Sequence, residues 1–249
     1  MTGYSWLGAE PGGRLASGVR FALIPMGVVS LLCLAWLAGC HTPRVLALPP
    51  LSATNKWASQ IGAFDSQDAT NPPPSRPIVF TGSSSFRMWK ELPQDYPGLR
   101  VVNRGFGGSQ LSDVAEHFER VILRYDPRQV VIYCGANDIA AKKSVEKVVS
   151  DLKVVVERIH RELPKTRVLF VSIALNPSRW DQRDKVLAAN AAIAEYMGLD
   201  PRRKYVDVTA AMLGSDGLPK PEIFLKDRLH MNRKGYELWK PIIGVELVR

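Results

Sequence analysis

Three adjacent serines, Ser83, Ser84 and Ser85, directly follow the apolar stretch "IVFTG" at residues 78–82. A serine hydroxyl becomes a nucleophile when a neighbouring base removes its proton. A turn from a strand into a helix would expose such a hydroxyl, whereas a solvated linker would use serines only as polar residues. A nucleophile needs a base, and it needs donors for the negative charge that develops on an attacked carbonyl oxygen.

Among the four histidines, His230 is the best candidate for the base. Asp227 precedes it by three residues, in a loop before the last helix. This spacing can bring both side chains to one side of a turn, and a carboxylate bonded to an imidazole fixes its tautomer. Alone, such a pair is more often an incidental feature of a surface loop. The other histidines, His41, His117 and His160, are expected to face solvent.

Two further segments could donate hydrogen bonds to an oxyanion. "GFGG", at residues 105–108, leaves backbone amides unobstructed, and Asn137 of "GAND" offers a side-chain amide. Taken singly, the glycines fit a tight turn that needs positive φ, and Asn137 fits a turn or a helix cap. The combination is more informative, because serines, glycines, Asn137 and the Asp–His pair all follow predicted strands or lie in loops.

Strands and helices that could position these residues alternate along the chain. The predicted strands are Ile78–Thr81, Arg100–Asn103, Gln129–Cys134, Arg167–Ile173 and Lys204–Val208. Their apolar residues do not alternate with polar ones, which is typical of parallel strands buried on both faces. The predicted helices are Leu111–Leu123, Val145–Leu163, Asp184–Met197 and a last one capped by Asn232 and running through Val248. This alternation predicts a doubly wound α/β fold, whose ligands bind beyond the carboxyl ends of the strands.

In this order, the motifs resemble those of the SGNH/GDSL hydrolase superfamily. "GSSS" is similar to the first conserved block, "NRGFGGS" to the second, "GAND" to the third and "DRLH" to the fifth. The resemblance covers the chain from Ile78 to its end. It implies a three-layer α/β/α sandwich around a mostly parallel, doubly wound, flavodoxin-like sheet of about five strands.

The resemblance also assigns roles to individual residues. It implies a catalytic triad of Ser84, His230 and Asp227, with an oxyanion hole formed by the amides of Ser84 and Gly108 and the side chain of Asn137. One position departs from the family pattern, because Ser83 stands where the family has an aspartate. The implied enzyme is a serine esterase that needs no metal and no organic cofactor.

The family includes lysophospholipases, thioesterases, arylesterases and carbohydrate acetylesterases, so the expected substrate is a small-molecule, lipid or glycan ester. Arg179 and Trp180 follow the fourth strand. They either line the rim of the pocket or form a solvated start of a helix. An envelope-bound binding module that has lost catalysis on the same fold is the alternative, and the missing aspartate is the feature that favours it.

Residues 1–39 are predicted to be a signal peptide. Arg14 and Arg20 precede an apolar core that ends in "LAGC", as in exported proteins. "LAGC" resembles the bacterial lipobox, whose cysteine, here Cys40, receives a lipid. An uncleaved transmembrane anchor is the alternative, since about 20 apolar residues can cross a bilayer. Both place the domain at a membrane of the cell envelope, outside the cytoplasm. A proline and a glycine inside the core lead us to favour the lipoprotein.

Residues 40–77 are predicted to be a tether with an outlying helix and the proline-rich connector "NPPPSRP", and residues 78–249 the hydrolase domain. The formal net charge is +9, but the basic residues are scattered rather than clustered with aromatics, so we expect no nucleic-acid partner. Cys134 lies in the apolar run "VVIYCG", where it is expected to be a buried small hydrophobe.

Overall fold

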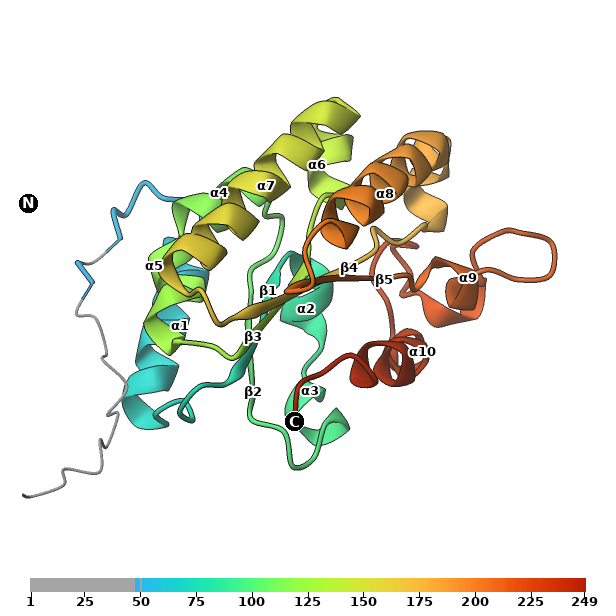
Figure 1. Ribbon diagram of the computed structural model, residues 1–249. Helices are drawn as coiled ribbons and strands as arrows, with labels where there is room; N and C mark the ends of the chain where they lie inside the picture. The colour runs from blue at the N-terminus through green and yellow to red at the C-terminus, as the bar shows by residue number, and fades with distance from the viewer. Residues whose placement is uncertain (1–47, 50) are drawn as a thin grey trace, which may run out of the picture. The chain divides into compact units, whose positions relative to one another are not determined.

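The computed structural model describes residues 48, 49 and 51–249, which form a twisted sheet covered by helices (Figure 1). The five strands are β1 (Ile78–Gly82), β2 (Val101–Gly105), β3 (Gln129–Tyr133), β4 (Arg167–Val171) and β5 (Arg203–Val206). They lie in the order β2-β1-β3-β4-β5, and every pair is parallel. This is the flavodoxin-like order, so the predicted fold class is confirmed.

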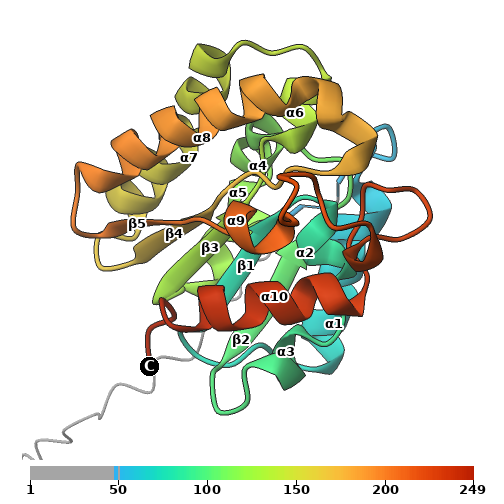
Figure 2. The same ribbon diagram turned by 90° about the vertical axis from the view of Figure 1, so that its right-hand side faces the viewer.

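Helices cover both faces of this sheet (Figures 1 and 2). The helices on one face are α1 (Ala58–Thr70), α4 (Leu111–Glu116), α5 (Phe118–Val121), α6 (Ala136–Ala140), α7 (Val145–Glu162) and α8 (Arg183–Gly198). Those on the other face are α2 (Ser84–Met88), α3 (Leu92–Asp95), α9 (Thr209–Met212) and α10 (Arg233–Gly244). Short 3-10 turns occupy Leu123–Tyr125, Pro177–Gln182 and Pro221–Ile223.

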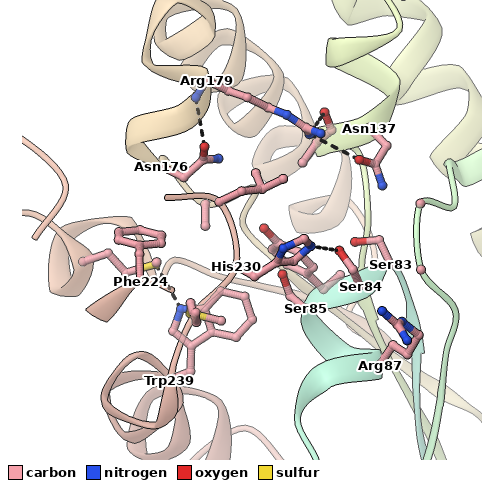
Figure 3. Close-up of a pocket in the computed structure, with 18 of the residues that line it drawn as sticks. Ser83, Ser84, Ser85, Arg87, Asn137, Asn176, Arg179, Phe224, His230 and Trp239 are labelled. Carbon is pink, nitrogen blue, oxygen red and sulfur yellow. Dashed lines mark hydrogen bonds between the residues drawn. The ribbon is translucent and has the colours of Figure 1, made fainter. Parts of the chain in front are cut away.

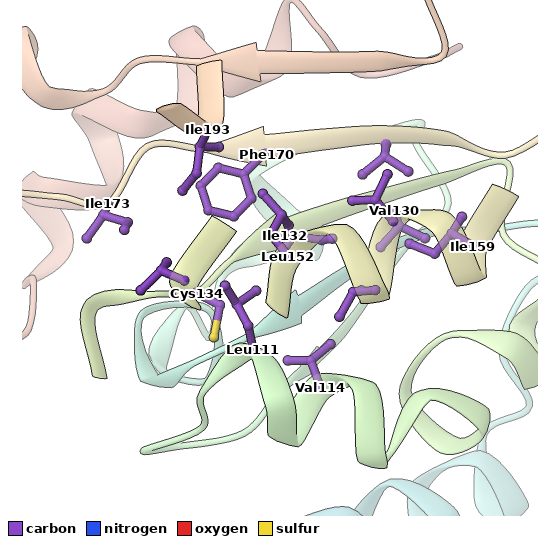
Figure 4. Close-up of a cluster of buried hydrophobic side chains, with 14 of the residues drawn as sticks. Leu111, Val114, Val130, Ile132, Cys134, Leu152, Ile159, Phe170, Ile173 and Ile193 are labelled. Carbon is purple, nitrogen blue, oxygen red and sulfur yellow. The ribbon is translucent and has the colours of Figure 1, made fainter. Parts of the chain in front are cut away.

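The strands are apolar on both sides because each side faces its own core. In β3, Val130 and Ile132 point into the cluster beneath α4, α7 and α8, which Figure 4 shows. Val131 and Tyr133 point into the other cluster, beneath α10. A strand buried on both faces cannot alternate apolar with polar residues, which explains the continuous apolar runs in the sequence.

The predicted elements are found, with one helix divided and the last helix ending at Gly244 rather than at Val248. The predicted helix Leu111–Leu123 breaks into α4 and α5 at His117, and a 3-10 turn follows. His117 is only 3% exposed, so the expectation that it faces solvent is wrong. Its Nε2 lies 3.3 Å from Asn55 Nδ2, and burial lowers its pKa. His160 is largely covered as well, since its side chain is 11% exposed.

The segment predicted to be a tether contains α1, and this helix packs on the core. Trp57 and Ile61 are buried in the same cluster as residues of α4 and α7. On the same helix, Asp68 pairs with Arg104 of β2. Both side chains of this pair are at least nine-tenths buried, so water does not compete with either partner for the ion pair. The helix is therefore packed against the sheet domain.

Candidate active site

Ser84, His230 and Asp227 form a continuous chain of hydrogen bonds at the carboxyl end of the sheet. Figure 3 shows the bond of this chain that joins His230 to Ser84. His230 Nδ1 lies 2.7 Å from Asp227 Oδ2, and His230 Nε2 lies 2.9 Å from Ser84 Oγ. A carboxylate only accepts hydrogen bonds, so Nδ1 carries the proton and Nε2 of the neutral ring accepts from the serine hydroxyl. This is the tautomer that allows an imidazole to remove the serine proton.

The loop that carries Asp227 and His230 is held by its own backbone. Asp227 Oδ1 accepts from the backbone N–H groups of Leu229 and His230, each at 3.0 Å. These bonds and the hydrogen bond from the imidazole lower the pKa of Asp227 to about 2. The carboxylate therefore stays charged at any pH near neutrality and can stabilise a protonated His230.

A sharp turn at Gly82 places Ser84 at the start of α2. Gly82 has φ +120°, and a Cβ there would lie 2.1 Å from the carbonyl oxygen of Tyr133, so only glycine fits. Of the three serines, Ser83 and Ser85 are buried, at 3% and 9% exposure. Ser84 is the one whose hydroxyl meets His230.

Backbone N–H groups at this turn and on the loop of residues 105–108, here called the glycine loop, are free to bind an oxyanion. Within residues 51–249, neither the Ser84 N–H nor the Gly108 N–H donates a hydrogen bond to another protein group. Gly108 lines the same cavity as Ser84 and has φ +77°, which is the left-handed conformation that glycine tolerates best. The two residues predicted to supply amide donors therefore line one cavity, and the N–H group of each is available to a ligand.

Asn137, the third predicted donor, is held in a fixed orientation. Its Nδ2 donates to the Ser109 carbonyl at 3.0 Å, and its Oδ1 accepts from Arg179 Nη1 at 3.2 Å. An amide nitrogen has two hydrogens, so one remains for a ligand. Arg179 also donates to the Ala136 carbonyl at 3.0 Å. It lines the cavity, so of the two alternatives for Arg179, the pocket rim and a solvated start of a helix, the first is found. Trp180 packs instead against the core on the α7 side.

Several supporting residues were missed by the sequence analysis. Asp138 is fully buried and accepts from Leu111 N–H at 3.2 and 3.3 Å and from Lys143 at 2.8 Å. It thereby joins the start of α4, which follows β2, to α6, which follows β3. The acidic residue of "GAND" was visible in the sequence, but nothing local indicated its partner.

The helix α1 segment also holds the glycine loop. The Gly107 N–H donates to Gln60 Oε1 at 2.7 Å, and Trp57 Nε1 donates to the Gly107 carbonyl at 2.9 Å. Both polar groups of Gly107 are thus fixed by side chains almost fifty residues earlier. No motif surrounds Gln60 or Trp57, so sequence spacing alone could not identify them.

The cavity beside Ser84 has a volume of about 490 Å³. Its lining includes the apolar side chains of Met212, Phe224, Met231 and Trp239 and the guanidinium groups of Arg87 and Arg179. In Figure 3, Phe224 and Trp239 lie apart from Arg87 and Arg179. A pocket of this size holds a small ligand, with apolar walls for burial and a few polar groups for orientation.

Predictions for the N-terminus lie outside the described residues. These are the signal peptide at residues 1–39 and the lipid site at Cys40. Within the part that the structure describes, no helix has the length and apolar character needed to cross a bilayer. Cys134 lies in the described part and is a buried free cysteine, as predicted.

The fold and the site define a class of protein. A sequence model of the GDSL-like lipase/acylhydrolase family matches residues 65–238, so the chain belongs to this family, whose members are hydrolases that act on esters. The match begins after Trp57 and Gln60, so these two residues lie outside the region that the family model describes. No curated protein matches the sequence.

Solved structures share the fold at low sequence identity. A protein from Streptococcus pneumonia described as a candidate platelet activating factor has a TM-score of 0.68 and 20% identity, over 76% of this chain and 92% of its own. A GDSL-like lipase from Bacteroides thetaiotaomicron has a TM-score of 0.63 and 20% identity, over 76% of this chain and 97% of its own. An acetylxylan esterase from Geobacillus stearothermophilus has a TM-score of 0.57 and 16% identity, over 69% of this chain and 94% of its own.

Proposed function

We propose that this protein is a serine esterase that hydrolyses carboxylic esters through Ser84, His230 and Asp227. One observation carries the proposal: the unbroken chain from Asp227 Oδ2 through the imidazole to Ser84 Oγ, at 2.7 and 2.9 Å. These distances lie within the range that proton transfer between a nucleophile and its base requires.

The reaction follows from where the groups lie. His230 Nε2 takes the Ser84 proton as Oγ bonds to the ester carbonyl carbon, and the carbonyl oxygen becomes an oxyanion. The N–H groups of Ser84 and Gly108 and the amide of Asn137 bind that charge. The bond to the alcohol then breaks, and His230 protonates the departing oxygen. Water, deprotonated by His230, attacks the acyl-enzyme, and the released Ser84 oxygen recovers the proton from His230 as the acid leaves.

Acyl and acetyl esters of lipids, thiols or carbohydrates are the proposed substrates. Family membership supports an acyl ester, and the solved relatives with this fold include a GDSL-like lipase and an acetylxylan esterase. The cavity of about 490 Å³ suits a short acyl group together with part of its alcohol.

Labelling with a fluorophosphonate is the most direct test, because this reagent modifies an activated serine. We expect a covalent adduct on the Ser84 peptide by mass spectrometry and hydrolysis of a 4-nitrophenyl acetate ester by the same preparation. A folded protein that shows neither would instead be the binding module, an alternative supported by Ser83 in the family's aspartate position.

We further propose that the mature protein is a lipoprotein of the bacterial cell envelope, anchored through Cys40. The support is the basic, apolar leader ending in "LAGC". In a bacterial host the wild type should fractionate with membranes, and Cys40→Ser should block lipid attachment. An unmodified Cys40 at the end of a processed chain, detected by mass spectrometry, would refute the anchor.

A further inference from the structure

Two arginines on the cavity wall have no acidic partner. Arg87 and Arg179 both line the cavity, and in the described part of the chain neither forms an ion pair with a carboxylate. Arg179 is partly buried, and Arg87 is exposed to solvent where it borders the cavity. Two unpaired guanidinium groups at one cavity therefore attract an anionic ligand.

Arg87 lies close to the reacting atoms. It follows Ser84 by three residues on α2, so the two side chains share one face of the helix. Its guanidinium also lies over the glycine loop, since a Cβ on Gly107 would come within 2.7 Å of Arg87 Nε. Figure 3 shows Arg87 near Ser84 among the residues that line the cavity.

Arg179 lies on the other side of the oxyanion donors. Its hydrogen bonds to Ala136 and Asn137 both use Nη1, so Nε and Nη2 keep their hydrogens for other partners. The two guanidinium groups therefore flank the amides that would bind the oxyanion, one beside the glycine loop and one beside Asn137.

Among the residues that the structure describes, no carboxylate lines the cavity to offset this charge. Asp227 is not part of the cavity wall, and both of its oxygens accept hydrogen bonds within its own loop. Ser83, which does line the cavity, is neutral. A ligand in the cavity would therefore meet two guanidinium groups, while the Asp227 carboxylate lies behind His230. Guanidinium groups match the geometry of carboxylates and phosphates.

We propose that the ester substrate carries an anionic group, a carboxylate or a phosphate, which Arg87 binds with support from Arg179. The inference rests on the proposed esterase function and adds the substrate class. The apolar side chains of the lining would receive the uncharged part of the molecule. Arg179 has a second role as a positioning residue, because it orients Asn137.

Matched pairs of esters test this proposal. The first pair is 4-acetoxybenzoate against neutral 4-acetoxybenzamide, which places the anion on the alcohol. The second is mono-4-nitrophenyl glutarate against 4-nitrophenyl butyrate, which places it on the acyl group. The third is 4-acetoxyphenyl phosphate against 4-acetoxybenzamide. For each pair the ratio of kcat/KM, anionic over neutral, is compared between proteins, so intrinsic ester reactivity cancels.

In Arg87→Gln we expect the ratio to fall about tenfold for at least one pair, the size of a lost charge-assisted hydrogen bond. Arg87→Lys should retain part of the preference. The preference should also weaken in high salt. Arg161→Gln, which removes an exposed arginine of α7 outside the cavity, controls for net charge and should leave every ratio unchanged. The ester pair whose ratio falls in Arg87→Gln identifies the anion, and whether it lies on the alcohol or on the acyl group.

Equal ratios in wild type, Arg87→Gln and Arg179→Gln for all three pairs would overturn the inference while leaving the esterase intact. If instead the wild type hydrolyses no ester, the proposed function fails, and binding still decides the inference. Saturation-transfer NMR with 4-hydroxybenzoate and 4-hydroxybenzamide should then show selective binding of the carboxylate, lost in Arg87→Gln. No selectivity would refute the anion site.

Discussion

Ser84 differs from Ser83 and Ser85 in the partner of its hydroxyl. All three residues lie at the end of β1, but Ser84 Oγ is 2.9 Å from the His230 imidazole, while Ser83 and Ser85 are buried. A hydroxyl without a base has too high a pKa to react near neutral pH. The proposed chemistry therefore depends on the hydroxyl of Ser84 alone.

Ser84→Ala is expected to lower kcat for a 4-nitrophenyl ester by about 10⁴-fold or more, because the nucleophile is lost. Ser83→Ala and Ser85→Ala should retain most activity and serve as matched controls on the same turn. Circular dichroism and thermal unfolding would verify that all three variants fold. An active Ser84→Ala together with an inactive neighbour would show that the register is wrong.

His230→Ala should lose almost as much activity as Ser84→Ala, and the double variant should be little worse than either, because the two residues act as a unit. Asp227→Asn should be milder, since a base remains without its charged partner. Steady-state rates of the purified variants measure these differences. A folded His230→Ala protein with wild-type activity would exclude the triad.

The pH profile tests the same pair independently. The base must be neutral, so kcat/KM should fall toward acid as His230 becomes protonated. The pKa of Asp227 is about 2, so protonation of this carboxylate contributes nothing to a loss of activity above about pH 4. A flat profile between about pH 8 and pH 5 in a protein that stays folded would contradict a histidine base.

At the scale of elements, the first turn of α1 and the residue before it support the glycine loop, which carries the proposed oxyanion donor Gly108, from outside the region that matches the family. Gln60 accepts from the Gly107 N–H at 2.7 Å, and Trp57 donates to the Gly107 carbonyl at 2.9 Å. A preorganised oxyanion hole needs such support, because a small displacement of a donor weakens transition-state binding.

Gln60→Ala is therefore expected to lower kcat about tenfold, with a smaller change in KM, because Gly108 loses the anchor of the preceding residue. Ser66→Ala, on the exposed side of the same helix, is the matched control. Rates and unfolding curves of the two variants separate a positioning role from general destabilisation. Equal kcat values would mean that the glycine loop holds its shape without α1.

At the scale of the whole molecule, the buried carboxylate of Asp95 links α3 to α10. Asp95 accepts from Arg233 at 2.5 and 2.6 Å and from Trp89 Nε1 at 2.7 Å, and its side chain is 4% exposed. These bonds hold the pKa of Asp95 well below its usual range. The contact fixes the last helix, which follows the loop of Asp227 and His230, against the rest of the domain.

Asp95→Asn should lower the free energy of unfolding by about 2 kcal/mol, which is less than for a fully buried pair because Arg233 is 41% exposed. A carboxylate with a lowered pKa stabilises the fold above the pKa of the unfolded state and loses this effect as pH falls. The difference in unfolding free energy between Asp95→Asn and wild type, measured by urea denaturation, should thus be constant above about pH 5 and shrink below about pH 4. Asp181→Asn, at an exposed position, is the control. A difference that grows toward acid would contradict the assignment.

The sequence by itself determined the fold class and which residues could meet. Continuous apolar runs and helical spacing depend on local periodicity, so all five strands were found within two residues of their observed ends. In a parallel sheet the carboxyl ends share one edge, so Ser84, Gly108 and Asn137 could be expected together. The spacing between Asp227 and His230 singled out the candidate base, and the family resemblance assigned it to Ser84, from which it is separated by 146 residues.

The tertiary structure decided what depends on contacts between distant segments. It selected Ser84 among three identical side chains, buried His117 against Asn55, and packed α1 on the core. It also placed Arg87 and Arg179 on one cavity without an acidic partner. A periodic pattern reports which face of an element is buried, but burial of a polar side chain and its partner depend on packing that no local pattern records.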